Sequence, residues 1–278
     1  MYGVRRMIWP LFLAIEALTF DFLDAMTAFL TLSIFEGSGK NSPRTCGWRG
    51  LIRAAISSLY PDSTPLWELR KMAGASSAPI RSSPPPAEQE IEFFFELVPE
   101  GALTPLLYKL QSGDELLMRK VPKGRFLLET HTGRSNHLLV STVTGVAPFV
   151  SYVRTSHKAW KEGNFDGSHK LYLLNGASRP WEFGYRHELL RFAREIPWFT
   201  CVPTLSRPWD HGDWTGEMGR ADDVLRKYAD QWGLDAGNTI AYLCGHPEMI
   251  AHSKAILKRR GFLDKEAIKE EIYRVPAK

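Results

Sequence analysis

The chain has little cysteine and no cysteine pair. Its three cysteines, Cys46, Cys201 and Cys244, lie far apart, and none belongs to a CxxC motif. A disulfide framework and a structural zinc site are therefore not indicated, and we expect a reducing, cytoplasmic setting. His246 and His252 have a spacing seen among metal ligands, but no further ligand joins them. We expect no bound metal.

The chain also has no large excess of charge of one sign. The formal net charge is +4, and 24% of the residues are charged against 44% hydrophobic, which is typical of a globular protein with a sizeable core. A mild basic excess suits phosphate ligands or an acidic protein partner. It is too weak to indicate nucleic acid binding, and we expect none.

An uninterrupted apolar segment is missing even from the N-terminal run MIWPLFLAIEALTFDFLDAMTAFL. Glu16, Asp21 and Asp24 lie within this run, and each carboxylate would be costly in a bilayer. Two arginines precede the run as in a signal peptide, but no clear A-x-A cleavage site follows. We expect no membrane insertion, and a targeting role stays open.

Three zones of the chain differ in character. Residues 1–82 lack steady periodicity and end in the loop-like GASSAPIRSSPPP, so we expect them to be irregular and poorly ordered. Residues 83–135 contain strand-like runs separated by turn signals, which indicate antiparallel β-structure. In residues 136–278 four strand–helix units follow one another, which predicts a parallel sheet covered by helices.

Four loops follow the strands of this predicted sheet: Thr144–Pro148, Gly176–Arg179, Ser206–Pro208 and Cys244–Pro247. The first consists of small residues before a helix. Such a loop lets a ligand approach the backbone and points the helix N-terminus at a phosphate, but by itself it is equally typical of a tight turn. Because ligands of parallel sheets bind beyond the carboxyl ends of the strands, the four loops together predict a binding site.

Arginines accompany these loops. Arg179 and Arg207 follow two of the strands, and Arg220 comes shortly afterwards. A guanidinium can bind a phosphate through two hydrogen bonds, although a single exposed arginine is more often plain surface charge. The three together favour a phosphorylated dinucleotide as the ligand. Cys244, taken alone, is typical of an inert core residue.

Several motifs in this part of the chain resemble the ferredoxin–NADP reductase family. They are ELVPEGALTPLLYKLQSGDELL, TVTGVAPF, NGASRPWEFGYRHEL, TLSRP, LCGHPEMI and the closing EEIY. The resemblance covers roughly residues 83–278. The resemblance implies a partial antiparallel β-barrel that binds FAD, followed by an α/β, Rossmann-like NADP domain. It also implies FAD-dependent electron transfer between NADP(H) and ferredoxin or flavodoxin.

The resemblance implies roles for residues around NADP. The pyrophosphate and the nicotinamide side would be held by Thr144, Gly145, Val146, Ala147 and Pro148. The 2′-phosphate end would be bound by Arg179, Ser206, Arg207 and Arg220. Cys244 and Gly245 would lie beside the nicotinamide ring.

On the flavin side the resemblance implies four further roles. Gly101 and Thr104 would approach the FAD pyrophosphate. Glu271 would aid proton and electron exchange near the flavin, and Tyr273 would stack on the isoalloxazine ring. The family often ends in Tyr-Trp, whereas here Arg274 follows the tyrosine and the chain continues.

Two other functions share parts of this pattern. A reductase component of an oxygenase system would have both domains, but the chain offers no iron–sulfur cysteine cluster in its support. A non-catalytic remnant would bind nucleotide without FAD.

A larger departure from the family lies upstream. Where members have an Arg-x-Tyr-Ser flavin motif, this chain reads SAPIRSSPP. In a shifted reading frame the codons of Tyr60–Glu68 permit Pro-Gly-Gln-Tyr-Thr-Val-Leu-Gly, and those of Ser77–Ser82 permit Arg-Ala-Tyr-Ser-Ile. We hypothesise that a segment from before Tyr60 to about Ser82 is frameshifted, with a diverged N-terminus as the alternative. The frameshift predicts missing barrel strands and impaired FAD binding.

Overall fold

The computed structural model describes residues 25–33, 49–55, 66–70, 77–81, 90–101, 103–110, 116–119 and 126–272. The chain divides into two compact units, residues 1–125 and residues 126–278. Among the described helices, none has the length and apolar character needed to cross a membrane.

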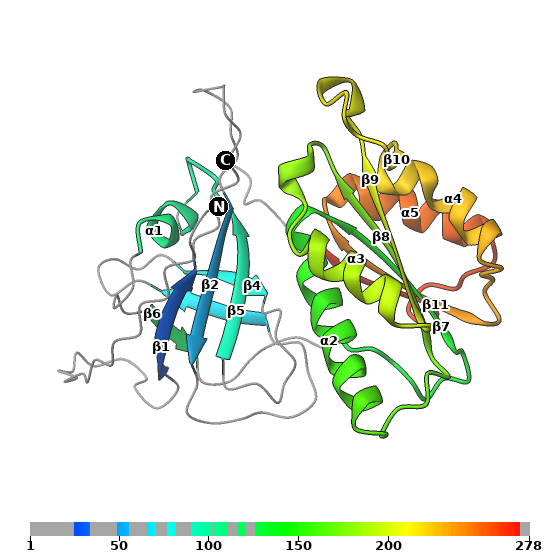
Figure 1. The fold of residues 1–278 in the computed structure, drawn as a ribbon, viewed down its shortest axis with the longest axis horizontal. Helices are drawn as coiled ribbons and strands as arrows, with labels where there is room; N and C mark the ends of the chain where they lie inside the picture. The colour runs from blue at the N-terminus through cyan, green and yellow to red at the C-terminus, as the bar shows by residue number, and fades with distance from the viewer. Residues whose placement is uncertain are drawn as a thin grey trace. The chain divides into compact units, whose positions relative to one another are not determined.

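The first unit contains a six-stranded antiparallel sheet (Figure 1). Its strand order is β4-β3-β6-β1-β2-β5, and a short helix, α1 (Thr104–Tyr108), follows β5. The strands are β1 (Ala25–Ser33), β2 (Arg49–Ala55), β3 (Leu66–Arg70), β4 (Ser77–Arg81), β5 (Glu90–Glu96) and β6 (Leu116–Arg119). Two of its strands, β5 and β6, lie in residues 83–135, where the sequence predicted part of an antiparallel barrel.

The expectation of irregular structure over residues 1–82 is wrong for four segments, because β1 to β4 all lie in this range and pair in the sheet. The strand β1, AMTAFLTLS, lies partly inside the long apolar N-terminal run. The apolar pattern therefore does not show where this strand begins and ends. Main-chain pairing also tolerates the uneven side-chain pattern of a segment such as LWELR in β3. The expected loss of barrel strands is likewise not seen. The remainder of residues 1–82, and the expected poor order there, lie outside the described residues.

The second unit is built on a six-stranded parallel sheet, as the sequence predicted. Its order is β10-β9-β8-β7-β11-β12. The strands are β7 (Asn136–Thr142), β8 (Lys170–Ala177), β9 (Phe199–Leu205), β10 (Glu217–Met218), β11 (Thr239–Gly245) and β12 (Ile268–Ile272). All seven residues of β11 are buried, which explains why this strand reads as a nearly continuous apolar run.

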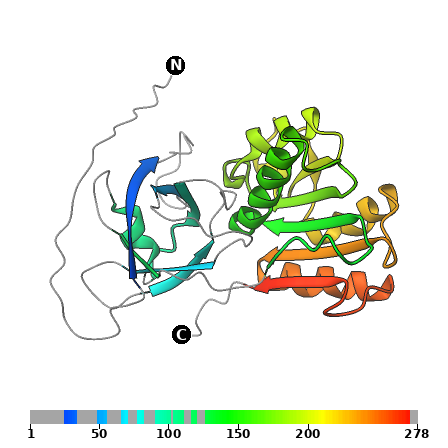
Figure 2. The same ribbon diagram turned by 90° about the horizontal axis from the view of Figure 1, so that it is seen from below.

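Helices lie on both sides of this sheet (Figure 2). They are α2 (Ala147–Lys161), α3 (Arg186–Glu195), α4 (Ala221–Gln231) and α5 (Pro247–Arg259). The helices α4 and α5 pack their buried faces against alternate residues of β7, β8 and β11 in one core cluster. A separate group of aromatic rings packs around Tyr242. The centroid of the Tyr242 ring lies 5.8 Å from that of Phe126 and 5.9 Å from that of Tyr152. The arrangement is the Rossmann-like α/β fold expected from the sequence.

Candidate functional site

The four predicted loops lie at one edge of the parallel sheet. They leave the carboxyl ends of β9, β8, β7 and β11, which are successive neighbours in the strand order. A single 3-10 turn accompanies three of them. The turn η2 (Val143–Val146) overlaps the first loop, η3 (Pro180–Glu182) directly follows the second, and η4 (Pro208–Asp210) begins at the last residue of the third. The sheet topology therefore brings together residues that are about 100 positions apart in the sequence.

Two glycines allow the loops after β7 and β11 to touch through their backbones. A Cβ atom on Gly145 would lie 2.2 Å from the carbonyl oxygen of Cys244 and 2.9 Å from the Cα of Gly245. Gly245 has a φ of +136°, and a Cβ there would lie 2.2 Å from Oγ1 of Thr142. Both positions therefore require glycine, because a side chain at either one would push the two loops apart.

Thr142 is a residue of this edge that the sequence analysis missed. Its Oγ1 accepts a hydrogen bond of 2.8 Å from the backbone N–H of His246. The imidazole Nδ1 of His246 in turn accepts from the N–H of Glu248 at 3.3 Å, at the start of α5. A threonine at the end of a strand is common, and only the parallel pairing of β7 with β11 shows that it holds the opposite loop.

The helix α2 begins directly at this edge. Thr144 and Val146 belong to η2, and Ala147 and Pro148 open the helix. No side chain within the described residues caps the first turn of α2, so its N–H groups are available to an anion. The five predicted residues of this loop thus lie where the sequence placed them.

Cys244 and Glu271 are brought side by side. They are paired in register between the parallel strands β11 and β12, and Ser141 of β7 is paired with Cys244 on its other side. The Cys244 side chain is fully buried, whereas Glu271 is half-buried. A thiol and a carboxyl group therefore share the carboxyl edge, as the predicted roles require. Tyr273 lies outside the described residues.

The loops after β8 and β9 are tied together. The backbone N–H of Ser206 donates to the carbonyl oxygen of Ala177 at 2.9 Å. The guanidinium carbon of Arg179 lies 5.6 Å from the ring centroid of Trp181, and Arg207 is exposed. Both arginines thus lie at the ends of adjacent strands, as expected.

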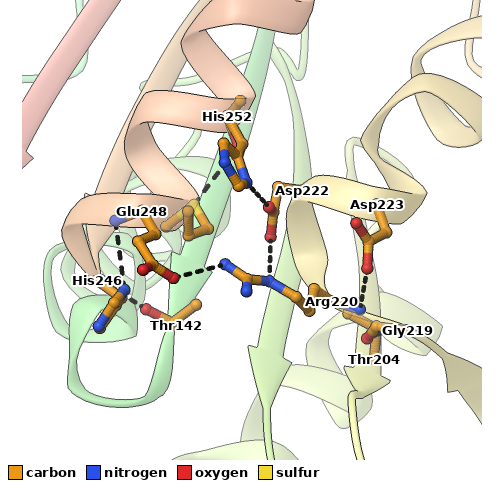
Figure 3. Close-up of polar contacts among 11 residues, drawn as sticks. Thr142, Thr204, Gly219, Arg220, Asp222, Asp223, His246, Glu248 and His252 are labelled. Carbon is orange, nitrogen blue, oxygen red and sulfur yellow. Dashed lines mark hydrogen bonds and ion pairs between the residues drawn. The ribbon is translucent and has the colours of Figure 1, made fainter.

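Arg220 has acidic neighbours that the sequence analysis did not foresee. Its Nε lies 3.3 Å from Oδ1 of Asp222, and one of its terminal nitrogens lies 3.6 Å from Glu248 (Figure 3). Asp222 is only 2% exposed, and its other oxygen lies 3.0 Å from Nδ1 of His252. Although partial burial opposes the shift, the charge and hydrogen bond of Asp222 raise the pKa of Arg220 above its usual value. The guanidinium joins the first turns of α4 and α5 at the same edge.

Replacement of Asp222 by asparagine tests this arrangement. The variant leaves Arg220 and His252 without their shared carboxylate, so we expect the free energy of unfolding to fall by about 1–3 kcal/mol, at the lower end because Arg220 is partly exposed. Urea denaturation at neutral pH measures it. Glu162→Gln, an exposed carboxyl just beyond α2, is the control, and equal stability of the two variants would contradict the assignment.

The two residues predicted on the flavin side lie in the first unit. Thr104 begins α1, accepts a hydrogen bond of 2.9 Å from the N–H of Val98 and donates one of 3.3 Å to the carbonyl oxygen of Val98. The N–H of Gly101 also donates to that oxygen, at 2.8 Å. Gly101 and Thr104 therefore both bind the main chain of Val98, just after β5.

His246 and His252, considered above as metal ligands, have other partners. His246 caps α5 and His252 contacts Asp222. Across the described part of the chain, no group of three or more His, Cys, Asp or Glu side chains is arranged to hold a metal ion.

Comparisons with known proteins agree with this geometry. Residues 139–255 match the family model of the oxidoreductase NAD-binding domain. The chain is 28% identical over 191 residues to a ferredoxin–NADP reductase of Pseudomonas aeruginosa, covering 64% of this chain and 69% of the relative. It is 24% identical to the toluate 1,2-dioxygenase electron transfer component of Pseudomonas putida, covering 62% of this chain and 47% of the relative.

A solved structure shares the fold. It is a ferredoxin NADP+ reductase from Neisseria gonorrhoeae with bound FAD and NADP, which superposes with a TM-score of 0.67 at 22% identity and covers 80% of this chain and 92% of its own. The parallel sheet and the loops at its carboxyl edge agree with the match to an oxidoreductase NAD-binding domain. Residues 139–255 thus match an oxidoreductase NAD-binding domain, and the chain is similar to ferredoxin–NADP reductases in sequence and in fold.

Proposed function

We propose that the protein transfers electrons between NADP(H) and a one-electron carrier protein, ferredoxin or flavodoxin, with FAD as its cofactor. The observation that carries the proposal is the close packing of the Gly145 loop against Cys244 and Gly245, with Glu271 in register beside the cysteine. The glycines keep this part of the carboxyl edge free of side chains, which suits the close approach of a pyrophosphate to the backbone.

Different residues of the second unit bind different parts of NADP(H). The first turn of α2, from Thr144 to Pro148, offers N–H groups to the pyrophosphate. Arg179, Ser206, Arg207 and Arg220 supply donors and positive charge for the 2′-phosphate end. Cys244, buried at the edge of the sheet, lies beside the nicotinamide and keeps water from it.

On the flavin side we assign Gly101 and Thr104 to the FAD pyrophosphate and Tyr273 to the flavin ring. When bound, FAD would supply the hydride and single-electron chemistry that links NADPH to the partner. Glu271 holds or moves a proton at its carboxyl group during this exchange. Cys244, Glu271 and Tyr273 are thus the proposed catalytic residues.

A second function is favoured by one of the similarities. An oxygenase reductase component would use the same two units, and the chain resembles one such component. The third reading, a nucleotide-binding remnant without FAD, follows from the unusual SAPIRSSPP segment.

Purified full-length chain separates these functions. Flavin absorbance measured after incubation with FAD shows whether the chain retains the cofactor, and diaphorase assays with NADPH and with NADH show which coenzyme is used. Reduction of ferredoxin or flavodoxin with a preference for NADPH supports the proposal. A chain that binds NADP+ but neither FAD nor a one-electron acceptor would be the remnant.

The frameshift hypothesis has its own test. We propose that the segment from before Tyr60 to about Ser82 reads the wrong frame of a reductase gene, and the DNA of codons 55–85 decides this. Codons that spell the flavin motif one frame over support the hypothesis, and restoring that frame should raise FAD occupancy. Codons that do not spell it favour a diverged N-terminus.

A further inference from the structure

An open cavity lies between the helices α4 and α5. Its volume is about 600 Å³, which is within the size range of small-molecule sites. Basic side chains come to its lining from both helices: Arg226 from α4, His252 and Arg259 from α5, and Arg260 directly after α5. None of the lining residues belongs to the four loops at the carboxyl edge. The proposed electron transfer does not use this cavity, so its own side chains decide what it can bind.

The two acidic residues of the lining already have partners. Asp222 is only 2% exposed, and its carboxylate lies between Nε of Arg220, at 3.3 Å, and Nδ1 of His252, at 3.0 Å (Figure 3). The carboxylate of Asp223 accepts a hydrogen bond of 3.3 Å from the backbone N–H of Arg220. Arg220 therefore offsets part of the negative charge, and Asp222 presents almost no surface to the cavity.

The arginines of the lining retain unused hydrogen-bond donors. Arg259 is exposed and makes no ion pair or hydrogen bond with any other described residue. The side chain of Arg226 is 80% exposed, and its Nε approaches Asp230 only to 3.9 Å. Arg260 binds the same Asp230 through one terminal nitrogen at 2.6 Å, but its Nε is buried and finds no hydrogen-bond partner in the part of the chain that the structure describes. Three guanidinium groups thus surround the cavity with donors to spare.

From these features we propose that the cavity between α4 and α5 binds a phosphate ester, at a site separate from the coenzyme site. A guanidinium matches a phosphate through two parallel hydrogen bonds, and the buried Nε of Arg260 would gain the partner that it lacks. Ala255 and Ile256 give the cavity an apolar wall, and Ile256 packs against the core between the helices. This wall suits the organic group of an ester, because the cavity is larger than a phosphate alone would fill.

Calorimetric titration with phenyl phosphate tests the inference. The carboxyl edge also offers donors to a phosphate, so the full chain with Arg179→Gln and Arg207→Gln serves as the reference protein. We expect the reference to bind phenyl phosphate, and Arg259→Gln, added to it, to weaken binding about 10-fold or more, the factor that corresponds to hydrogen bonds with a charged group. Arg194→Gln is the matched control and should bind like the reference, because Arg194 is likewise an exposed arginine in the last turn of a helix.

Two results would overturn the inference. One is a reference protein that binds no phenyl phosphate, and the other is equal affinity with and without Arg259. Inorganic phosphate should bind more weakly than phenyl phosphate, and equal affinity for the two would contradict the role of the apolar wall. Because Arg259 is exposed and has no partner among the described residues, its replacement should leave the midpoint of urea denaturation unchanged. Weaker binding then reflects the loss of the guanidinium and not unfolding.

Discussion

Alanine in place of Gly245 is expected to abolish nucleotide binding and to destabilise the second unit by about 3 kcal/mol or more. The residue has a φ of +136°, and the new Cβ would lie 2.2 Å from Oγ1 of Thr142. Either the β11 loop moves away or the hydrogen bond that the N–H of His246 donates to Oγ1 of Thr142 is lost. Gly145→Ala should act similarly, since its Cβ would lie 2.2 Å from the carbonyl oxygen of Cys244.

Gly212 supplies the matched control for both variants. It has no positive φ, and a Cβ added there would have no neighbouring atom within 4 Å, so Gly212→Ala should change neither stability nor binding. Urea denaturation and titration with NADP+ measure the two effects. Near wild-type affinity in Gly245→Ala would show that the contact between the β7 and β11 loops is not part of the binding site.

Acidification is expected to destabilise the protein through one buried histidine. His137, at the start of β7, is fully buried, and its Nε2 lies 2.9 Å from Nδ1 of His169. Its own Nδ1 finds no hydrogen-bond partner among the described residues. Burial, and secondarily the neighbouring His169, lower the pKa of His137 from 6.5 to about 3. The folded state therefore holds this imidazole neutral.

The direction of the pH effect follows from proton counting. Between pH 6.5 and about 3 the unfolded chain binds a proton at His137 that the folded chain does not, so stability falls as pH falls through this window. The loss is about 1.4 kcal/mol between pH 7.5 and 5.5. Well above pH 6.5, where His137 is neutral in both states, this residue contributes no pH dependence.

His137→Gln isolates this contribution, because the amide can still hydrogen-bond to His169 but does not titrate. Unfolding free energies of wild type and variant are compared at pH 7.5 and 5.5, so that acid effects of other groups cancel. The wild type should lose about 1.4 kcal/mol more than the variant. Parallel pH profiles would mean that His137 is protonated in the folded state.

The parallel half of the fold was predictable because its strands are buried on both faces. Such strands read as short apolar runs, and in HLLVST the sequence shows both the run and the small-residue loop that follows. The carboxyl-edge rule then places Gly145, Arg207 and Cys244 together from the sequence alone. The antiparallel half was harder, because β1 lies partly within an apolar run that is much longer than the strand.

Several side-chain contacts of the site could not be predicted, because they join residues that are far apart in the sequence. The hydrogen bond between Thr142 and His246 joins residues 104 positions apart. Asp222 reads as an ordinary acidic residue in the first turn of a helix, yet it is buried because Arg220 and His252 approach it from either side.

Hydrogen exchange of the full chain with and without NADP+ is the most direct test of a coenzyme site at the carboxyl edge. Backbone amides in residues 142–148, 206–210 and 244–248 should become protected together, whereas residues 163–170, which precede β8 at the opposite edge, should exchange at unchanged rates. Protection at the opposite edge, or no protection at saturating NADP+, would contradict the account.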